Sequence, residues 1–225
     1  MKQYAIGDVH GCFTALETLV EFVQIESDDL LVMLGDYVDR GPDSRRVVQW
    51  LIGQSARRNL VCLQGNHEIM MLEALSSLPQ RRRWGIHGGA ETFDSYDDAD
   101  QELEEAVPEE HWRFLKNLLP YYETETHVFV HAAADGDLPM EAQANYKLFW
   151  DRFGSITPRD DGKVFVCGHT SQKSGLPKRN DHAICIDTNA CRGGWLTCLD
   201  VGTGKFFQAN QDQETRTGWI DEHEE

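Results

Sequence analysis

The stretch Leu30-Leu-Val-Met-Leu-Gly-Asp-Tyr-Val-Asp-Arg-Gly41 joins an unbroken apolar run to a dense cluster of charge. The apolar part, residues 30–34, is typical of a strand that is covered on both faces, as parallel strands of α/β sheets are. A glycine then allows a sharp turn, and Asp36, Asp39 and Arg40 follow. Because buried carboxylates need a neutralising partner, this strand end predicts a metal ion or a paired cation beside it.

The same construction occurs at two other places in the chain. Ala5-Ile-Gly-Asp-Val-His-Gly11 and Leu60-Val-Cys-Leu-Gln-Gly-Asn-His-Glu68 are apolar runs that end in a glycine and then in carboxylate, amide or imidazole side chains. Strands of this kind that alternate with helices predict an α/β fold with a mainly parallel sheet. The carboxyl ends of parallel strands lie together, so we expect these polar side chains to meet at one edge of the sheet.

Apolar periodicity and start signals predict the order of the first elements. We expect strands and helices to alternate at residues 3–9, 12–23, 30–35, 44–54, 59–64 and from about 69. Residues 79–120 turn polar and helical in pattern, and we interpret them as a helical insertion beside the site. Within this insertion, Arg81-Arg82-Arg83 is interpreted as a solvated helix face.

Strand patterns return in the second half of the chain, at residues 121–133, 163–168, 183–187, 195–200 and 204–208. The last three have no helix between them, which predicts an antiparallel portion of a second sheet. We expect one domain over residues 1–225. The acidic segments 94–110 and 212–225 are interpreted as solvated faces and a frayed terminus.

Composition limits the class of protein further. The formal net charge is −17, from 38 acidic and 21 basic residues, which argues against a nucleic-acid-binding surface. No segment approaches the roughly 18 apolar residues of a membrane span, and the first residues do not have a signal-peptide profile. The six cysteines form no CxxC motif and predict buried thiols of a reducing compartment. We therefore expect a cytoplasmic protein.

Six residues of metal-ligand type each follow an apolar run by one or two positions: Asp8, His10, Asp36, Asn66, His131 and His169. A single histidine or aspartate at such a place is more often a turn or capping residue, but six repetitions are hard to explain in that way. One ion is satisfied by three or four ligands, so the number favours two ions, with one carboxylate, best Asp36, as the bridge. Oxygen and nitrogen ligands without a thiolate indicate manganese, iron or zinc.

Three motifs resemble, in order, the signatures of the phosphoprotein phosphatase family of metallophosphoesterases: Gly7-Asp-Val-His-Gly11, Gly35-Asp-Tyr-Val-Asp-Arg-Gly41 and Gly65-Asn-His-Glu68. His131-Ala132 and Gly168-His-Thr170 resemble the two remaining histidine motifs, so the resemblance covers residues 4–200. Trp150-Asp-Arg152 and Ile186-Asp-Thr188 are similar to segments of the compact phage and bacterial serine/threonine phosphatases. The family resemblance implies a calcineurin-like fold, in which helices flank a two-sheet β-sandwich.

The resemblance also implies roles for single residues. One ion would be held by Asp8, His10 and Asp36, and the other by Asp36, Asn66, His131 and His169. A metal-bridging water or hydroxide would attack phosphorus directly, without a covalent phosphoenzyme. Arg40 and Arg152 would hold the phosphoryl oxygens, and His67 would protonate the leaving alkoxide, oriented and kept cationic by Asp39. The alternatives are an Asp39–Arg40 pair and a surface salt bridge of Arg152.

The predicted activity is hydrolysis of phosphomonoesters with manganese, above all of phosphoserine and phosphothreonine in proteins, by a monomer. Symmetrical cleavage of diadenosine tetraphosphate is the nearest alternative, and Gly41-Pro-Asp-Ser44 resembles that family. Asp39 and Glu68 favour the phosphatase, because the diadenosine hydrolases typically lack the first and usually have aspartate at the second. A non-catalytic metal-binding regulator would have lost Arg40 or His67. His87 either faces the substrate cleft or is an ordinary loop histidine.

Overall fold

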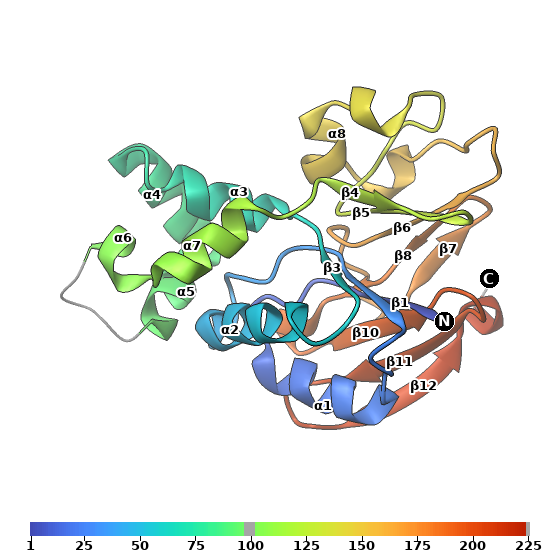
Figure 1. Cartoon of the computed structure of the whole chain (residues 1–225), viewed down its shortest axis with the longest axis horizontal. Coiled ribbons are helices and arrows are strands. Elements are labelled where there is room, and N and C mark those ends of the chain that lie inside the picture. The colour runs from blue at the N-terminus through green and yellow to red at the C-terminus, as the bar shows by residue number, and fades with distance from the viewer. Residues whose placement is uncertain (97–101, 224–225) are drawn as a thin grey trace.

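Two β-sheets pack face to face in the computed structural model, which describes residues 1–96 and 102–223 (Figure 1). The first sheet contains, in spatial order, β12 (Thr215–Trp219), β11 (Lys205–Ala209), β10 (Trp195–Asp200), β1 (Gln3–Ile6), β2 (Leu30–Met33) and β3 (Leu60–Cys62), and β9 (Asp187–Thr188) pairs with β10. The second sheet contains β4 (Tyr121–Glu123), β5 (His127–Val130), β6 (Val164–Cys167), β8 (Ala183–Cys185) and β7 (Lys178–Asn180). The predicted two-sheet, calcineurin-like fold class is confirmed.

The central strands of each sheet are parallel and in register. Ile6 lies opposite Met33, and Met33 lies opposite Cys62, so the loops after β1, β2 and β3 begin at the same level. In the second sheet β5, β6 and β8 are also parallel. This arrangement explains why side chains from distant parts of the sequence gather at one end of the sandwich.

The composition of β2 follows from burial on both faces. Leu31 and Met33 pack on the side of the helices, whereas Val32 and Leu34 pack in the layer between the sheets. Alternate side chains of a strand point to opposite faces, so an apolar residue is needed at every position. The helices α1 (Phe13–Val23) and α2 (Ser44–Ser55) cover the outer face of the first sheet, and α8 (Asn145–Trp150) packs on the second.

The predicted helical insertion is present. It consists of α4 (Leu78–Trp84), the π-helix η1 (Gly85–Gly89), α5 (Ala90–Ser95), α6 (Leu103–Ala106) and α7 (Glu109–Lys116). Gly88, with a φ of 109°, interrupts η1, so this segment forms a kink between α4 and α5. In Figure 1 these helices form a lobe beside the sandwich, together with α3 (Asn66–Glu73). Arg82 and Arg83 are exposed, in agreement with the interpretation of the arginine run as a solvated face, while Arg81 pairs with Glu102, and Arg83 contacts Glu73 and lies over the Trp150 ring.

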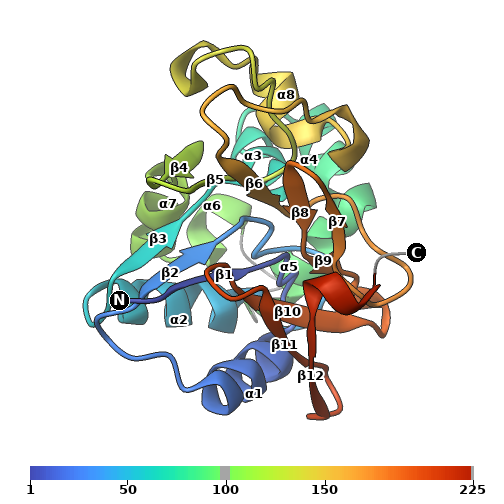
Figure 2. The same ribbon diagram turned by 90° about the vertical axis from the view of Figure 1, so that its right-hand side faces the viewer.

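The late strands differ from the prediction. β10 and β11 are antiparallel, but they extend the first sheet next to β1, as Figure 2 shows, whereas β8 lies in the second sheet as predicted, parallel to β6 and antiparallel to β7. The physical reason is burial, since β10 places Leu196 in the helix-side core and Leu199 between the sheets. The tail predicted to fray contributes β12 at the sheet edge, while residues 224–225 lie outside the described residues.

All six cysteines are free thiols, and four are buried as predicted, whereas Cys62 and Cys191 are half-buried. Of the acidic segment 94–110, residues 97–101 lie outside the described residues, and the remainder joins α5, α6 and α7. Among the helices that the structure describes, none combines the length and the apolar character needed to cross a membrane.

Candidate active site

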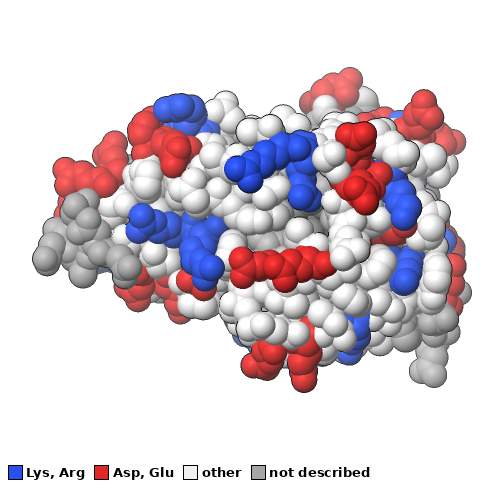
Figure 3. Space-filling view, turned by 60° about the horizontal axis from the view of Figure 1, so that its bottom comes forward, with Lys and Arg blue, Asp and Glu red and all other residues white. Residues whose placement is uncertain are grey.

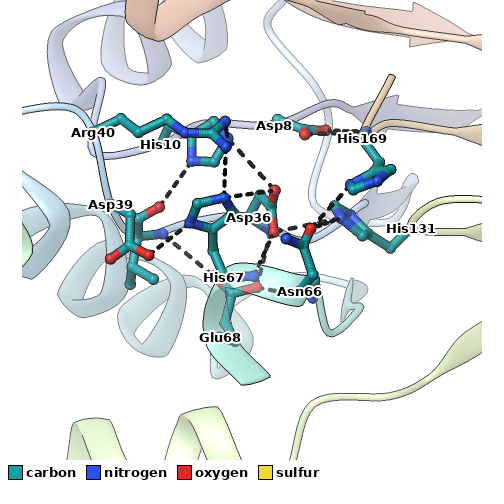
Figure 4. A network of polar contacts seen from close by, with 12 residues as sticks. Asp8, His10, Asp36, Asp39, Arg40, Asn66, His67, Glu68, His131 and His169 are labelled. Carbon is teal, nitrogen blue, oxygen red and sulfur yellow. Dashed lines mark hydrogen bonds and ion pairs between the residues drawn. The ribbon is translucent and has the colours of Figure 1, made fainter. Parts of the chain in front are cut away.

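The six predicted metal ligands lie at the carboxyl ends of five strands, three in the first sheet and two in the second (Figure 4). Asp8 and His10 follow β1, Asp36 follows β2, and Asn66 opens α3 directly after β3. His131 follows β5, and His169 follows β6. The main-chain oxygen of Asp36 accepts the N–H of His10 at 2.8 Å, which ties the first two loops together. Both sheets therefore contribute to one site.

Asp36 lies at the centre of this arrangement. Its Oδ2 is 3.5 Å from Nε2 of His10, and its Oδ1 is 3.4 Å from Nε2 of His131. Two groups of possible ligand atoms share it: His10, Asp36 and His67 form one, and Asp36, His131 and His169 form the other. A carboxylate that faces one histidine with each oxygen has the geometry of a bridge between two ions.

Hydrogen bonds fix the ring nitrogens of the second group. Nδ1–H of His131 donates to the carbonyl of Leu34 at 2.9 Å, which leaves the Nε2 lone pair 2.9 Å from Oδ1 of Asn66. His169 places Nε2 toward the carbonyl of Trp150 at 3.3 Å, and its Nδ1 lies 3.0 Å from the same amide oxygen. With these tautomers, acceptor atoms converge with no proton between them, an arrangement that a cation would stabilise.

Burial keeps these imidazoles neutral. It lowers the pKa of His131 to about 3 and that of His169 to about 4, and it holds the pKa of His10 well below its usual range. His10 also donates from Nδ1, to the carbonyl of Val38 at 2.9 Å, so its Nε2 carries the lone pair that a metal ion would need. Neutral rings that are oriented by main-chain oxygens are the usual form of metal-ligating histidines.

Asp8 is buried next to two other carboxylates. Burial, Asp187 and Asp36 together raise its pKa well above the usual value. Both of its oxygens accept the N–H of His169 at 3.1 Å, and its carboxylate is turned toward that residue rather than toward His10. An uncompensated cluster of buried carboxylates is unfavourable, so the donor set fits divalent cations bound at this place.

The backbone is strained where the site residues project. Five of the eight non-glycine residues with positive φ in the described part of the chain belong to the predicted site: His10, Asp36, Asp39, Arg40 and His169. Such conformations cost of order 1–3 kcal/mol each and persist where the surroundings enforce them. The signature glycines allow the close packing, because a Cβ on Gly65 would lie 2.2 Å from Oδ1 of Asp36.

His67 and Asp39 form a buried pair. Nδ1 of His67 lies 2.6 Å from Oδ2 of Asp39, and both side chains are shielded from solvent. Sequence analysis did not find the residues that hold this pair, namely Trp84, whose Nε1–H donates to the carboxylate at 2.9 Å, and Thr92, whose hydroxyl donates at 2.8 Å. Both come from the helical insertion, which therefore serves to build the site.

Burial opposes the effect that was expected of Asp39 on the charge of His67. Burial lowers the pKa of His67 to about 4 and raises that of Asp39 to about 7, because removal from water disfavours either charge. The proton that the pair shares is held in the 2.6 Å hydrogen bond. Nε2 of His67 faces Arg40, from whose guanidinium it accepts a hydrogen bond at 2.7 Å.

Arg40 points its guanidinium into the site. It also reaches Nε2 of His10 at 2.6 Å, so one arginine bridges two site histidines. Its main-chain N–H donates to the carbonyl of Gly88 in the π-helix at 3.0 Å. Gly88 has a φ of 109°, and a Cβ there would lie 2.7 Å from the arginine Cγ. The π-helix therefore sets the position of Arg40, a role that the sequence pattern did not reveal.

Glu68 has a structural role that its motif position did not disclose. Its carboxylate accepts four main-chain N–H groups, those of Asp36, Tyr37, Val38 and Gly65, at 2.7–3.3 Å. Burial and the charge of Asp36 raise its pKa, and the hydrogen bonds counter this effect. Glu68 thus fixes the loop that carries the bridging carboxylate. Its interaction with the loop after β2 spans 30 to 32 residues of sequence, which a local pattern cannot show.

Arg152 is exposed at the rim of the site. It follows α8, and its charge adds to the burial that lowers the pKa of His169. His87 is exposed in the π-helix, where Nδ1 contacts the carbonyl of Arg83 at 2.7 Å. It also lines a cleft that contains Arg40, so the alternative of a histidine facing the cleft agrees with the structure.

This site and this fold belong to the class of metal-dependent phosphoesterases. A family model described as calcineurin-like phosphoesterase matches residues 1–184. The chain belongs to this family, whose members use divalent metal ions, and it is a phosphoesterase. The described site residues provide the candidate metal-binding groups.

Relatives with two different activities are similar to this chain. The serine/threonine-protein phosphatase 1 of Salmonella typhimurium is 31% identical over 209 residues, which cover 88% of this chain and 91% of that protein. A symmetrical bis(5'-nucleosyl)-tetraphosphatase of Pseudomonas putida is 32% identical over 133 residues, 59% of this chain and 42% of that protein. A crystal structure provisionally named a diadenosine tetraphosphatase has a TM-score of 0.69 and 20% identity, and the match covers 97% of this chain and 94% of that one.

Proposed function

We propose that this protein is a serine/threonine protein phosphatase that hydrolyses phosphomonoesters with two divalent metal ions. The observation that carries the proposal is the buried His67–Asp39 pair, held by Trp84 and Thr92 beside Arg40. A proton donor is needed when a basic alkoxide leaves, as it does from phosphoserine. Similarity to a serine/threonine phosphatase over most of both chains supports the same conclusion.

The residues divide the reaction between them. Two divalent ions, when bound by Asp8, His10, Asp36, Asn66, His131 and His169, would supply Lewis acidity and activate a water for in-line attack on phosphorus. Arg40 and Arg152 bind the phosphoryl oxygens, for which the planar guanidinium is well shaped. A bound phosphate dianion next to Nε2 of His67 favours the protonated ring, which then donates that proton to the leaving oxygen.

Metal identity and cellular context form part of the proposal. Oxygen and imidazole ligands without a thiolate favour manganese, with iron or zinc as alternatives. Six free cysteines favour a reducing compartment, the cytoplasm. On the face shown in Figure 3, acidic and basic side chains of the described residues are interspersed without a broad basic area. This supports phosphoproteins rather than nucleic acids as partners of a monomeric enzyme.

Symmetrical cleavage of dinucleoside tetraphosphates is the second candidate. It is favoured by the similarity to tetraphosphatases, which covers 59% of this chain in one relative. The purified protein should be assayed with manganese against a phosphoserine peptide and diadenosine tetraphosphate, each with and without EDTA. We expect metal-dependent release of phosphate from the peptide at a higher kcat/KM. Preferential cleavage of the tetraphosphate to two diphosphates would replace the proposed function by the second candidate.

A further inference from the structure

A cleft of about 430 Å³ opens beside the guanidinium of Arg40. Ile86, His87 and Glu91, from the π-helix and the start of α5, form one wall, and the 3-10 turn η4 (Ala190–Arg192) forms the other. The cleft adjoins the catalytic site, because Arg40 lines it and also contacts His10 and His67.

The turn that forms the second wall is rigidly built. Asn189 adopts a left-handed conformation with a φ of 68°, and its carbonyl accepts the N–H groups of Arg192 at 3.1 Å and Gly194 at 3.0 Å. Its own N–H donates to Oδ1 of the buried Asp187 at 3.0 Å. The backbone that carries Arg192 is therefore fixed before a ligand arrives, which lowers the entropic cost of binding.

Arg192 presents a free positive charge in this cleft. Its side chain is exposed, and within the part of the chain that the structure describes it has neither an ion pair nor a side-chain hydrogen bond. The chain has a net charge of −17. The unpaired cation at the rim of the site is therefore opposite in sign to the net charge of the molecule. Glu91 lies on the opposite wall and would repel an anion. An anionic group in the cleft is therefore favoured next to Arg192.

We propose that this cleft binds the polypeptide segment next to the phosphorylated residue, and that Arg192 selects an acidic side chain in that segment. The inference rests on the proposed function, because a phosphoryl group held by Arg40 projects the rest of its substrate into the cleft. An ion pair with an exposed arginine changes an equilibrium by about 1.5- to 5-fold. Arg192 is in this account a specificity-determining residue and takes no part in the chemical step.

The test uses phosphoserine peptides that differ only by glutamate or glutamine, placed in turn at each of three positions on either side of the phosphoserine. For the wild-type protein we expect a kcat/KM ratio of about 1.5 to 5 in favour of glutamate at one or more positions. Arg192→Gln should bring that ratio to about 1. Arg57→Gln, which removes the same charge from an exposed position after α2, should keep it. The wild-type preference should also decrease with added salt.

Four outcomes distinguish a failure of the inference about Arg192 from a failure of the proposed function. A preference that Arg192→Gln abolishes and Arg57→Gln retains supports the inference. A ratio of 1 in the wild-type protein, or one that Arg192→Gln leaves unchanged, overturns the inference and leaves the proposed function intact. Cleavage of diadenosine tetraphosphate without hydrolysis of any peptide overturns the proposed function together with the inference. A loss in Arg192→Gln confined to the tetraphosphate assigns the cleft to a phosphate chain and also overturns the inference.

Discussion

Among single residues, Trp84 connects the helical insertion to the proposed proton donor. Its indole N–H donates to both carboxylate oxygens of Asp39 at 2.9 and 3.0 Å. Trp84→Phe removes this donor and keeps most of the ring. Because a hydrogen bond to a charged group contributes about 1.5–3 kcal/mol, we expect kcat on a phosphoserine peptide to fall about tenfold or more.

Trp112 offers the matched control for this change. It is equally buried, and its Nε1–H donates to the carbonyl of Glu104 at 3.2 Å, away from the site. Trp112→Phe should lower the melting temperature without changing kcat. If both variants lose activity in proportion to their loss of stability, Trp84 has only a packing role.

His67 gives a second prediction for a single residue. His67→Asn should lower kcat on a phosphoserine peptide by roughly 10²–10⁴-fold and leave KM nearly unchanged. The loss should be much smaller for an aryl phosphate, whose phenolate needs little protonation. Equal losses on the two substrates, with chemistry shown to be rate-limiting, would contradict the role of general acid.

The residues that sequence analysis found and missed differ in one physical respect. The six ligand types each follow an apolar strand, so their position along the chain already indicates where they lie in space. Trp84, Thr92 and Glu68 act through contacts that span 31 to 53 residues of sequence. Nothing local in the chain specifies such partners, and only the packing of the insertion on the sandwich brings them together.

Among the elements, the π-helix between α4 and α5 has the clearest influence on the site. Gly88→Ala would place a methyl group 2.7 Å from both N and Cγ of Arg40, at a residue with a φ of 109°. We expect KM and the inhibition constant for free phosphate to rise in parallel by roughly 10- to 100-fold, because small displacements of a positioning group are costly. Steady-state kinetics with phosphate as inhibitor measure both quantities.

Gly53 in α2 provides the control for this prediction. A Cβ there meets no atom within 4 Å, so Gly53→Ala should leave both constants unchanged. A Gly88→Ala variant that keeps normal phosphate inhibition would show that the π-helix does not position Arg40.

The helices with strong apolar periodicity were predicted correctly. The prediction failed for strands whose sheet depends on which strand they pair with. The helices near residues 12–23 and 44–54 lie within one residue of the predicted bounds at each end. The predicted Gly88-Gly89 break is also present, because Gly88, with a φ of 109°, interrupts the helix between α4 and α5. The strands at residues 195–200 and 204–208 were placed in the wrong sheet, since sequence patterns do not say which free edge a strand will join.

At the scale of the whole molecule, each of the two sheets supplies part of the proposed metal site. The first sheet supplies Asp8, His10, Asp36 and Asn66 from the loops after β1, β2 and β3, and the second supplies His131 and His169. We therefore expect metal binding to stabilise the sandwich, because the ions bind only when the two sheets are packed together. Thermal unfolding with EDTA and with excess manganese should differ by several degrees, and an unchanged melting temperature would contradict this coupling.

The central claim is a pair of ions bridged by Asp36, and titration of metal-stripped protein with manganese tests it most directly. Calorimetry and the rate on an aryl phosphate should be followed together for the wild-type protein and Asp36→Asn, which keeps the size of the side chain and removes its charge. We predict that the stripped protein is inactive, that activity returns as two ions bind per chain, and that Asp36→Asn loses both tight binding and rate. Full activity in stripped protein, or two tightly bound ions and a normal kcat in Asp36→Asn, would contradict the account.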